Sequence, residues 1–141
     1  MIYIANVGDS RALMSLDYGS QIAVLSRDHK PEDEHEKNRI QLAGGRIYRT
    51  QTFAKAAQTA TEKDLYVSGP MRVFPGRLSV SRTFGDIEAK RAKYGGNPQV
   101  IICEPEICQF KLGDNQDFIM MGCDGIFDRL TNKDVINTMW E

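Results

Sequence analysis

Short apolar segments separated by turn-forming residues constrain the fold of this chain more than any other feature. The segments are too short for helices and rich in β-branched residues, as strands are; they lie at 2–7, 12–14, 22–25, 100–103, 107–110 and 118–123. Strands and helices do not alternate regularly along the chain. The pattern therefore predicts an α+β fold built on antiparallel sheets.

Turn chemistry and apolar character refine this prediction. Gly8-Asp9-Ser10 separates the first two segments, and we expect them to pair as a β-hairpin. The fully apolar run at 118–123 predicts a central strand. Segment 50–75 has no apolar stripe, so we expect a long, exposed and poorly packed loop there.

Two helices are predicted from their start and stop signals. Pro31 is a favourable first helical residue, acidic residues follow it, and Gly44-Gly45 marks the end. A last helix begins at Thr131, with Asp134 three residues later as the capping partner. The final residues carry no cap or polar tail, and a strand begins with the chain itself, so we expect a domain that is truncated at both ends.

Composition excludes several classes of function. The formal net charge is −1 and the pI about 6.1, and no basic block indicates binding to nucleic acid or to an anionic membrane. No apolar run approaches the roughly 20 residues of a membrane span. The three cysteines have no zinc-binding spacing, which predicts buried free thiols in a cytoplasmic or nuclear protein.

The strongest candidate site lies at the end of the last apolar run. Asp124 follows that run, and Asp128 comes four residues later, so one helical turn would place both carboxylates on the same side. Paired carboxylates favour Mg²⁺ or Mn²⁺. The alternative is that Asp124-Gly125 is a turn and Asp128 starts a helix, and these residues alone do not separate the two interpretations.

Other polar residues allow a structural explanation as well. Asp9 lies in a sequence that is ordinary for hairpins. Asp28-His29 could be a ligand pair, but capping of the helix at Pro31 is the favoured interpretation. Ser79 and Ser81 have no histidine base near them in sequence, which argues against a serine nucleophile.

Taken together and in order, five motifs resemble those of the metal-dependent protein serine/threonine phosphatases of type 2C (the PPM family). The motifs lie at 5–12, 25–45, 78–86, 104–107 and 117–128. The resemblance implies a four-layer α/β/β/α sandwich of two antiparallel sheets flanked by helices, incomplete at both ends. It also makes the segment at about 47–76 a variable flap beside the active site.

The resemblance implies roles for individual residues. Asp124 corresponds to a ligand of a central Mg²⁺ or Mn²⁺ pair, and Asp9 and Asp128 join it at a weaker third metal. Gly125 and Asp86 correspond to residues that support the site. A metal-activated water would then hydrolyse phosphoserine or phosphothreonine in phosphoprotein substrates.

Some family elements are not found in this sequence. The Asp-Gly-His-Gly-Gly block and an upstream phosphate-binding Arg have no counterpart here. The late Asp-Asn pair is also missing, because Asp114-Asn115 precedes Asp124 and so lies on the wrong side of it. We therefore expect only part of an active site and no useful activity of the chain alone. The alternative is a non-catalytic binding or scaffold module in a larger assembly; a carboxylate-rich metal protein without phosphatase ancestry is a remote third.

Overall fold

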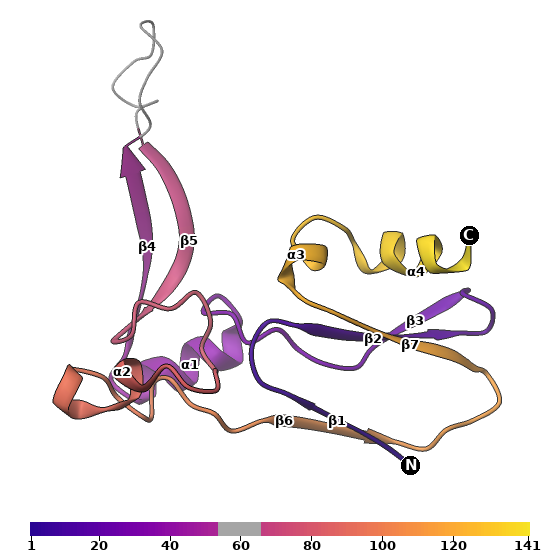
Figure 1. The fold of residues 1–141 in the computed structure, drawn as a ribbon, viewed down its shortest axis with the longest axis horizontal. Coiled ribbons are helices and arrows are strands. Elements are labelled where there is room, and N and C mark those ends of the chain that lie inside the picture. The colour runs from indigo at the N-terminus through magenta and orange to yellow at the C-terminus, as the bar shows by residue number, and fades with distance from the viewer. Residues whose placement is uncertain (54–65) are drawn as a thin grey trace, which may run out of the picture. The chain divides into compact units, whose positions relative to one another are not determined.

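The computed structural model describes residues 1–53 and 66–141 and divides into two units (Figure 1). The first unit comprises Met1–His29 and Cys103–Glu141, and the second comprises Lys30–Ile102. All three sheets of the described residues are antiparallel, and helices accompany them. The predicted α+β class is therefore confirmed.

The first unit contains two sheets. β2 (Arg11–Leu16) lies between β3 (Gln21–Val24) and β7 (Gln116–Gly122), and β1 (Ile2–Asn6) pairs with β6 (Glu106–Phe110). The expected hairpin of the first two strands is wrong, because β1 and β2 belong to different sheets. The expectation of a central strand at 118–123 is also wrong within the described residues, since β7 is an outer strand and β2 occupies the centre.

Alternation along β2 explains how the sheets are layered. Ala12 and Met14 pack with Ile4 of β1 and Phe110 of β6, whereas Leu13 faces the opposite side and packs with the C-terminal helices. Successive side chains of a strand point to opposite faces. The loop after β1 therefore carries the chain from one sheet to the next, and β1 meets β2 face to face.

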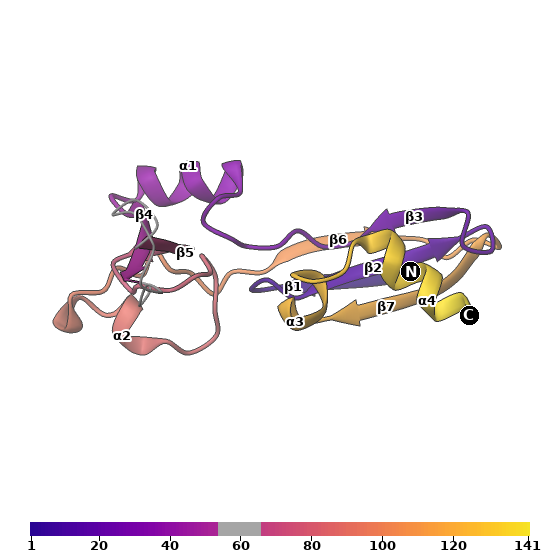
Figure 2. The ribbon, with the colours of Figure 1, turned by 90° about the horizontal axis from the view of Figure 1, so that it is seen from above.

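Two helices cover the free face of the three-stranded sheet. α3 (Asp124–Phe127) and α4 (Asn132–Trp140) contribute Phe127, Val135 and Ile136 to a core with Leu13, and both lie on the side opposite β1 and β6 (Figures 1 and 2). The capping box of Thr131 and Asp134 is present, as predicted. The unit thus forms three of the four layers expected for the sandwich.

The second unit is built on a β-hairpin with a helix against it. β4 (Arg46–Phe53) pairs with β5 (Tyr66–Phe74), and α1 (Glu34–Leu42) lies against β4. Short helical turns, α2 (Ile87–Lys90) and η2 (Ala92–Tyr94), follow later. Its core consists of buried aliphatic side chains; they are Ile40, Val73, Ala89, Val100 and Ile101.

Several local predictions in the second unit need correction. α1 begins at Glu34 and not at Pro31, because the Asp33 side chain accepts from the amides of His35 and Glu36 and so caps the helix. Residues 100–103 form a single bridge, Arg82 to Ile102, rather than a strand.

Where the structure describes the segment at 50–75, it is a hairpin and not a loop, although most of its residues are exposed or half-buried, as predicted. β4 reaches Phe53 and β5 begins at Tyr66, and Val73 is fully buried. The sequence concealed β5 because Gly69-Pro70 interrupts it, and both residues are unfavourable inside strands. Residues 54–65 lie outside the described part, and the flap boundaries of 47–76 stay a prediction.

The cysteines are free, as predicted, but none is buried, since Cys103 and Cys123 are exposed and Cys108 is half-buried. Cys103 follows the isolated bridge and Cys123 precedes α3, so neither is shielded by strand packing. Of the helices that the structure describes, none is long and apolar enough to cross a membrane.

Candidate functional site

The loop that carries Asp9 is held by several polar contacts. The side-chain amide of Asn6 donates to the carbonyl of Arg27 at 2.8 Å and to that of Gly8 at 3.2 Å. Gly8 has φ +110°, a conformation that favours glycine. These contacts fix the backbone immediately before Asp9, whose side chain is half-buried.

His29 fixes the same loop from within the core. It is fully buried, its backbone amide donates to the Gly8 carbonyl at 3.0 Å, and its Nδ1 accepts from the Gly8 amide at 3.1 Å. Since Nδ1 is an acceptor, the proton of a neutral ring resides on Nε2, which lies 3.4 Å from Glu106 Oε2. His29 therefore acts as a positioning residue for the Asp9 loop.

Asp124 and Asp128 are the first residue and the C-cap of α3. The Asp128 amide donates to the Asp124 carbonyl at 2.8 Å, so the single helical turn predicted from their spacing is confirmed. Both side chains are exposed. Gly125 lies within the same turn, where an added Cβ would meet only the Cys123 Sγ at 3.5 Å.

Strand register places Asp9 and Asp124 at the same end of one ladder. Arg11 pairs with Gly122, and the antiparallel strands diverge from this point into the two loops. Asp9 is two residues before Arg11, and Asp124 is two residues after Gly122. The topology thus brings residues that are 115 positions apart in sequence to one edge of the three-stranded sheet.

Arg11 supplies positive charge at this edge. Its guanidinium makes a two-point contact with the Asp28 carboxylate at 2.9 and 2.8 Å, and Nη1 donates to Asn132 Oδ1 at 2.7 Å. The hydrogen bond to Asp28 and the charges of Asp28 and Asp128 raise the pKa of Arg11, against the effect of burial. Arg11 also lies 4.7 Å from the centre of the Phe127 ring.

Two site residues were misjudged from the sequence. Asp28 pairs with Arg11 and His29 is buried against Gly8, so neither caps a helix at Pro31. The Asp28-His29 dipeptide marks both residues in the sequence, but their partners, Arg11 and Gly8, are distant in sequence and are recognised only in the folded chain. Asp86, expected to support the site, is the exposed N-cap of α2 in the second unit, with φ +46°.

The donor set for a metal ion is incomplete within this part of the protein. Carboxylates at one sheet edge suit Mg²⁺ or Mn²⁺, yet the described residues contain no group of three His, Cys, Asp or Glu side chains arranged to hold an ion. The convergence of Asp9, Asp124 and Asp128 on one metal thus stays a prediction, although they share an edge.

The similarity to known proteins extends over nearly the whole chain. The family model described as Protein phosphatase 2C matches residues 1–139. The chain is 34% identical to "Probable protein phosphatase 2C 4" of Paramecium tetraurelia over 96% of its own length and 38% of the relative's. It is 33% identical to "Probable protein phosphatase 2C 60" of Arabidopsis thaliana, covering 99% of this chain and 33% of that one.

Solved structures that resemble this chain also match it over nearly its whole length. The fold resembles "Structure of a C.elegans sex determining protein", with TM-score 0.69, 26% identity, and coverage of 96% of this chain and 26% of that one. It also resembles a phosphatase from a pathogenic strain of Toxoplasma gondii, with TM-score 0.64, 27% identity, and coverage of 96% and 35%. The chain thus spans about a third of the length of the curated relatives it matches.

Proposed function

The chain belongs to the protein phosphatase 2C family, and on that premise we propose that it supplies part of the active site for metal-dependent hydrolysis of phosphoserine and phosphothreonine in proteins. The observation that carries the proposal is the shared sheet edge of Asp9 and Asp124, with Asp128 one turn later. These carboxylates come from two segments that are distant in the sequence.

The residues of the chain would act mainly through position. Asp124 would bind one ion of an Mg²⁺ or Mn²⁺ pair, and Asp9 and Asp128 would hold a weaker third ion beside it. Bound metal would activate the attacking water and neutralise phosphate oxygens. His29 and Asn6 would keep the Asp9 loop in place, while Arg11 would balance the excess negative charge near Asp128.

The remaining ligands would come from segments outside this sequence. We therefore expect the isolated chain to show only background hydrolysis of a phosphothreonine peptide in millimolar manganese, since each missing site group commonly costs on the order of 10²-fold or more in rate.

Free thiols in all three cysteines support a reducing, cytoplasmic or nuclear setting.

A chimera tests the proposal. The chain would replace the matching 137-residue segment of the Paramecium relative, which then supplies the rest of the family's sequence. We expect manganese-dependent hydrolysis of a phosphothreonine peptide that stops when the metal is chelated. A folded chimera without activity, beside an active parent, would favour the alternative of a non-catalytic scaffold module in a larger assembly.

A further inference from the structure

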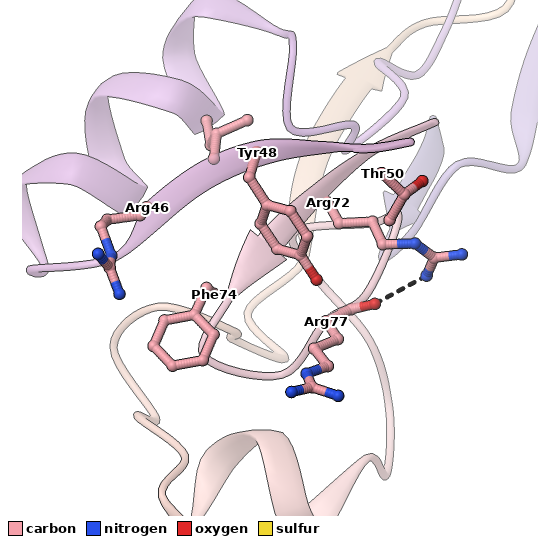
Figure 3. A pocket seen from close by; sticks show the side chains of 7 residues that line it. Arg46, Tyr48, Thr50, Arg72, Phe74 and Arg77 are labelled. Carbon is pink, nitrogen blue, oxygen red and sulfur yellow. Dashed lines mark hydrogen bonds between the residues drawn. The ribbon is translucent and has the colours of Figure 1, made fainter. Parts of the chain in front are cut away.

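A groove on the β4–β5 hairpin combines three arginines with two aromatic rings (Figure 3). Arg46 lies opposite Phe74, and Tyr48 lies opposite Arg72. These four side chains share one face, because the alternate position Val73 points into the core. Arg77, in the turn after β5, completes the lining.

The groove is open and of useful size. Its volume is about 740 Å³, within the range of typical ligand sites. Phe74 is 42% exposed, and Arg46 and Arg77 are exposed as well. In Figure 3 the side chains of Arg46, Tyr48, Phe74 and Arg77 surround the hollow from both strands and the turn.

Among the residues that the structure describes, no acidic side chain neutralises the groove arginines. Arg46 lies 5.1 Å from the centre of the Phe74 ring, and Arg72 Nη1 donates to the Arg77 carbonyl at 2.7 Å. In the described part of the chain no carboxylate forms an ion pair with any of the three, and no Asp or Glu lines the groove. Glu88 shares a second cavity with Phe74 and Arg77 but does not pair with Arg77.

Two half-buried arginines of the same unit, Arg39 and Arg82, behave differently. Arg39 and Arg82 both donate to the Glu36 carboxylate, as expected where a charge is shielded from water. The contrast indicates that the groove presents guanidinium groups that an external anion can reach.

Charge is distributed unevenly between the two units. Residues 30–102 contain 13 Lys and Arg but 8 Asp and Glu, for a net charge of +5, whereas the rest of the chain has 5 and 11, for a net charge of −6. The overall charge of −1 conceals this separation. The groove therefore lies in a unit whose field attracts anionic partners.

We propose that the groove binds an acidic polypeptide segment. Guanidinium groups match carboxylates in two-point contacts, and Arg46 and Arg77 are placed to make them. Tyr48 and Phe74 would receive an apolar side chain of the same segment. A nucleic acid would need a longer basic track along its backbone, whereas this groove pairs its charges with an apolar floor.

The inference rests on the proposed function only in identifying the segment as a flank of the phosphorylated residue in a substrate. Binding itself requires neither phosphate nor metal. If the peptide does not bind, only the proposed binding role of the groove is rejected. The proposed phosphatase reaction is tested separately by the hydrolysis assay of the chimera.

Fluorescence anisotropy with the intact 141-residue chain provides the test. The probe is a short labelled peptide rich in glutamate, with a central leucine and no phosphate, measured in the presence of a chelator. Its matched control replaces each glutamate by glutamine. We expect the acidic peptide to bind and the Arg46→Gln, Arg77→Gln double variant to weaken binding at least about tenfold, since charged hydrogen bonds are lost.

Arg49→Gln serves as the matched protein control. Arg49 is exposed on the same strand but does not line the groove, so we expect at most about a twofold change from its long-range charge. Amide chemical shifts of the wild-type chain add a measurement that does not depend on variants, and binding should shift the signals of 46–50 and 72–77.

Three results would overturn the proposal. The first is an equal loss of affinity in the Arg49→Gln variant, which would indicate only general attraction to a positive unit. The second is unchanged binding in the double variant or shifts confined to other segments. The third is tighter binding of single-stranded nucleic acid or of anionic lipid vesicles in competition with the peptide.

Discussion

Glu36 offers the most informative perturbation of the fold. Its side chain is 2% exposed and accepts hydrogen bonds from Arg82, Arg39 and Ser81. Burial alone would raise the pKa of Glu36, but the hydrogen bonds from Arg82, Arg39 and Ser81 lower it from 4.5 to about 2. The carboxylate therefore joins α1 to the segment that follows β5.

The pKa gives the magnitude. At about 1.4 kcal/mol for each pH unit of difference, the ionised Glu36 contributes about 3 kcal/mol to the free energy of unfolding at neutral pH. Removing one partner of a buried ion pair commonly costs about 3–5 kcal/mol, in the same range. We predict that Glu36→Gln lowers the unfolding free energy of the second unit by about 3 kcal/mol at neutral pH.

The sign of the pH dependence follows from the lowered pKa. The stabilisation is complete above the ordinary pKa of 4.5 and disappears as the pH falls toward about 2, where the folded carboxylate is protonated. The wild-type chain should lose the Glu36 contribution across this interval, and the variant has no such contribution to lose. Their difference should thus be largest at neutral pH and vanish in strong acid.

Amide hydrogen exchange measures this effect within the second unit. The amides of Val73 and Ile101 donate to the carbonyls of Leu78 and Asn97, and we expect their exchange to become roughly 100-fold faster in Glu36→Gln. Glu34→Gln is the control, because its pair with Lys37 is exposed and worth little. Equal protection in both variants, or a deficit that persists unchanged in acid, would show that the Glu36 carboxylate does not stabilise the second unit.

Three further predictions concern the first unit. Thr131→Ala should lower stability by about 1 kcal/mol through loss of the α4 cap, and a melting temperature equal to wild type would contradict this. Gly19→Ala should cost about 1–3 kcal/mol, because φ is +80° and an added Cβ would lie 2.7 Å from Trp140 Nε1; an unchanged tryptophan emission spectrum and midpoint would show that the turn adapts. Asp28→Ala should cost about 1–3 kcal/mol in urea denaturation by leaving Arg11 without its carboxylate, and no change would mean that water or Asn132 compensates.

Local signals predicted the elements better than their pairing. The capping box at Thr131 and the helical turn from Asp124 to Asp128 depend on residues three or four apart, and both are confirmed. The residues of β6 that pair with β1 are 100 to 108 positions away, and nothing in Gly8-Asp9-Ser10 distinguishes a hairpin turn from a passage between sheets. Pairing depends on packing, which a local pattern does not encode.

In the candidate site, too, local sequence predicts some residues, whereas others are recognised only from long-range contacts. The position of Asp124 after an apolar run and the spacing of Asp128 predicted two of the site residues, whereas the role of Asp9 follows from the family resemblance. The topology places Asp9 and Asp124 at one edge, with Asp128 one helical turn later. The roles of His29 and Arg11 required long-range contacts, to Gly8 and to Asp28. The groove on β4 and β5 escaped prediction because Gly69-Pro70 concealed the strand that carries Arg72 and Phe74.

A manganese titration of the active chimera tests whether Asp124 binds a metal ion that the reaction needs. Initial rates would be compared for the unmodified chimera, Asp124→Ala and Asp114→Ala, where Asp114 is an exposed turn residue outside the proposed site. We predict that Asp124→Ala loses on the order of 10²-fold or more in rate at every manganese concentration, while Asp114→Ala follows the unmodified titration. An Asp124→Ala chimera with the full rate and the same manganese requirement would contradict this prediction.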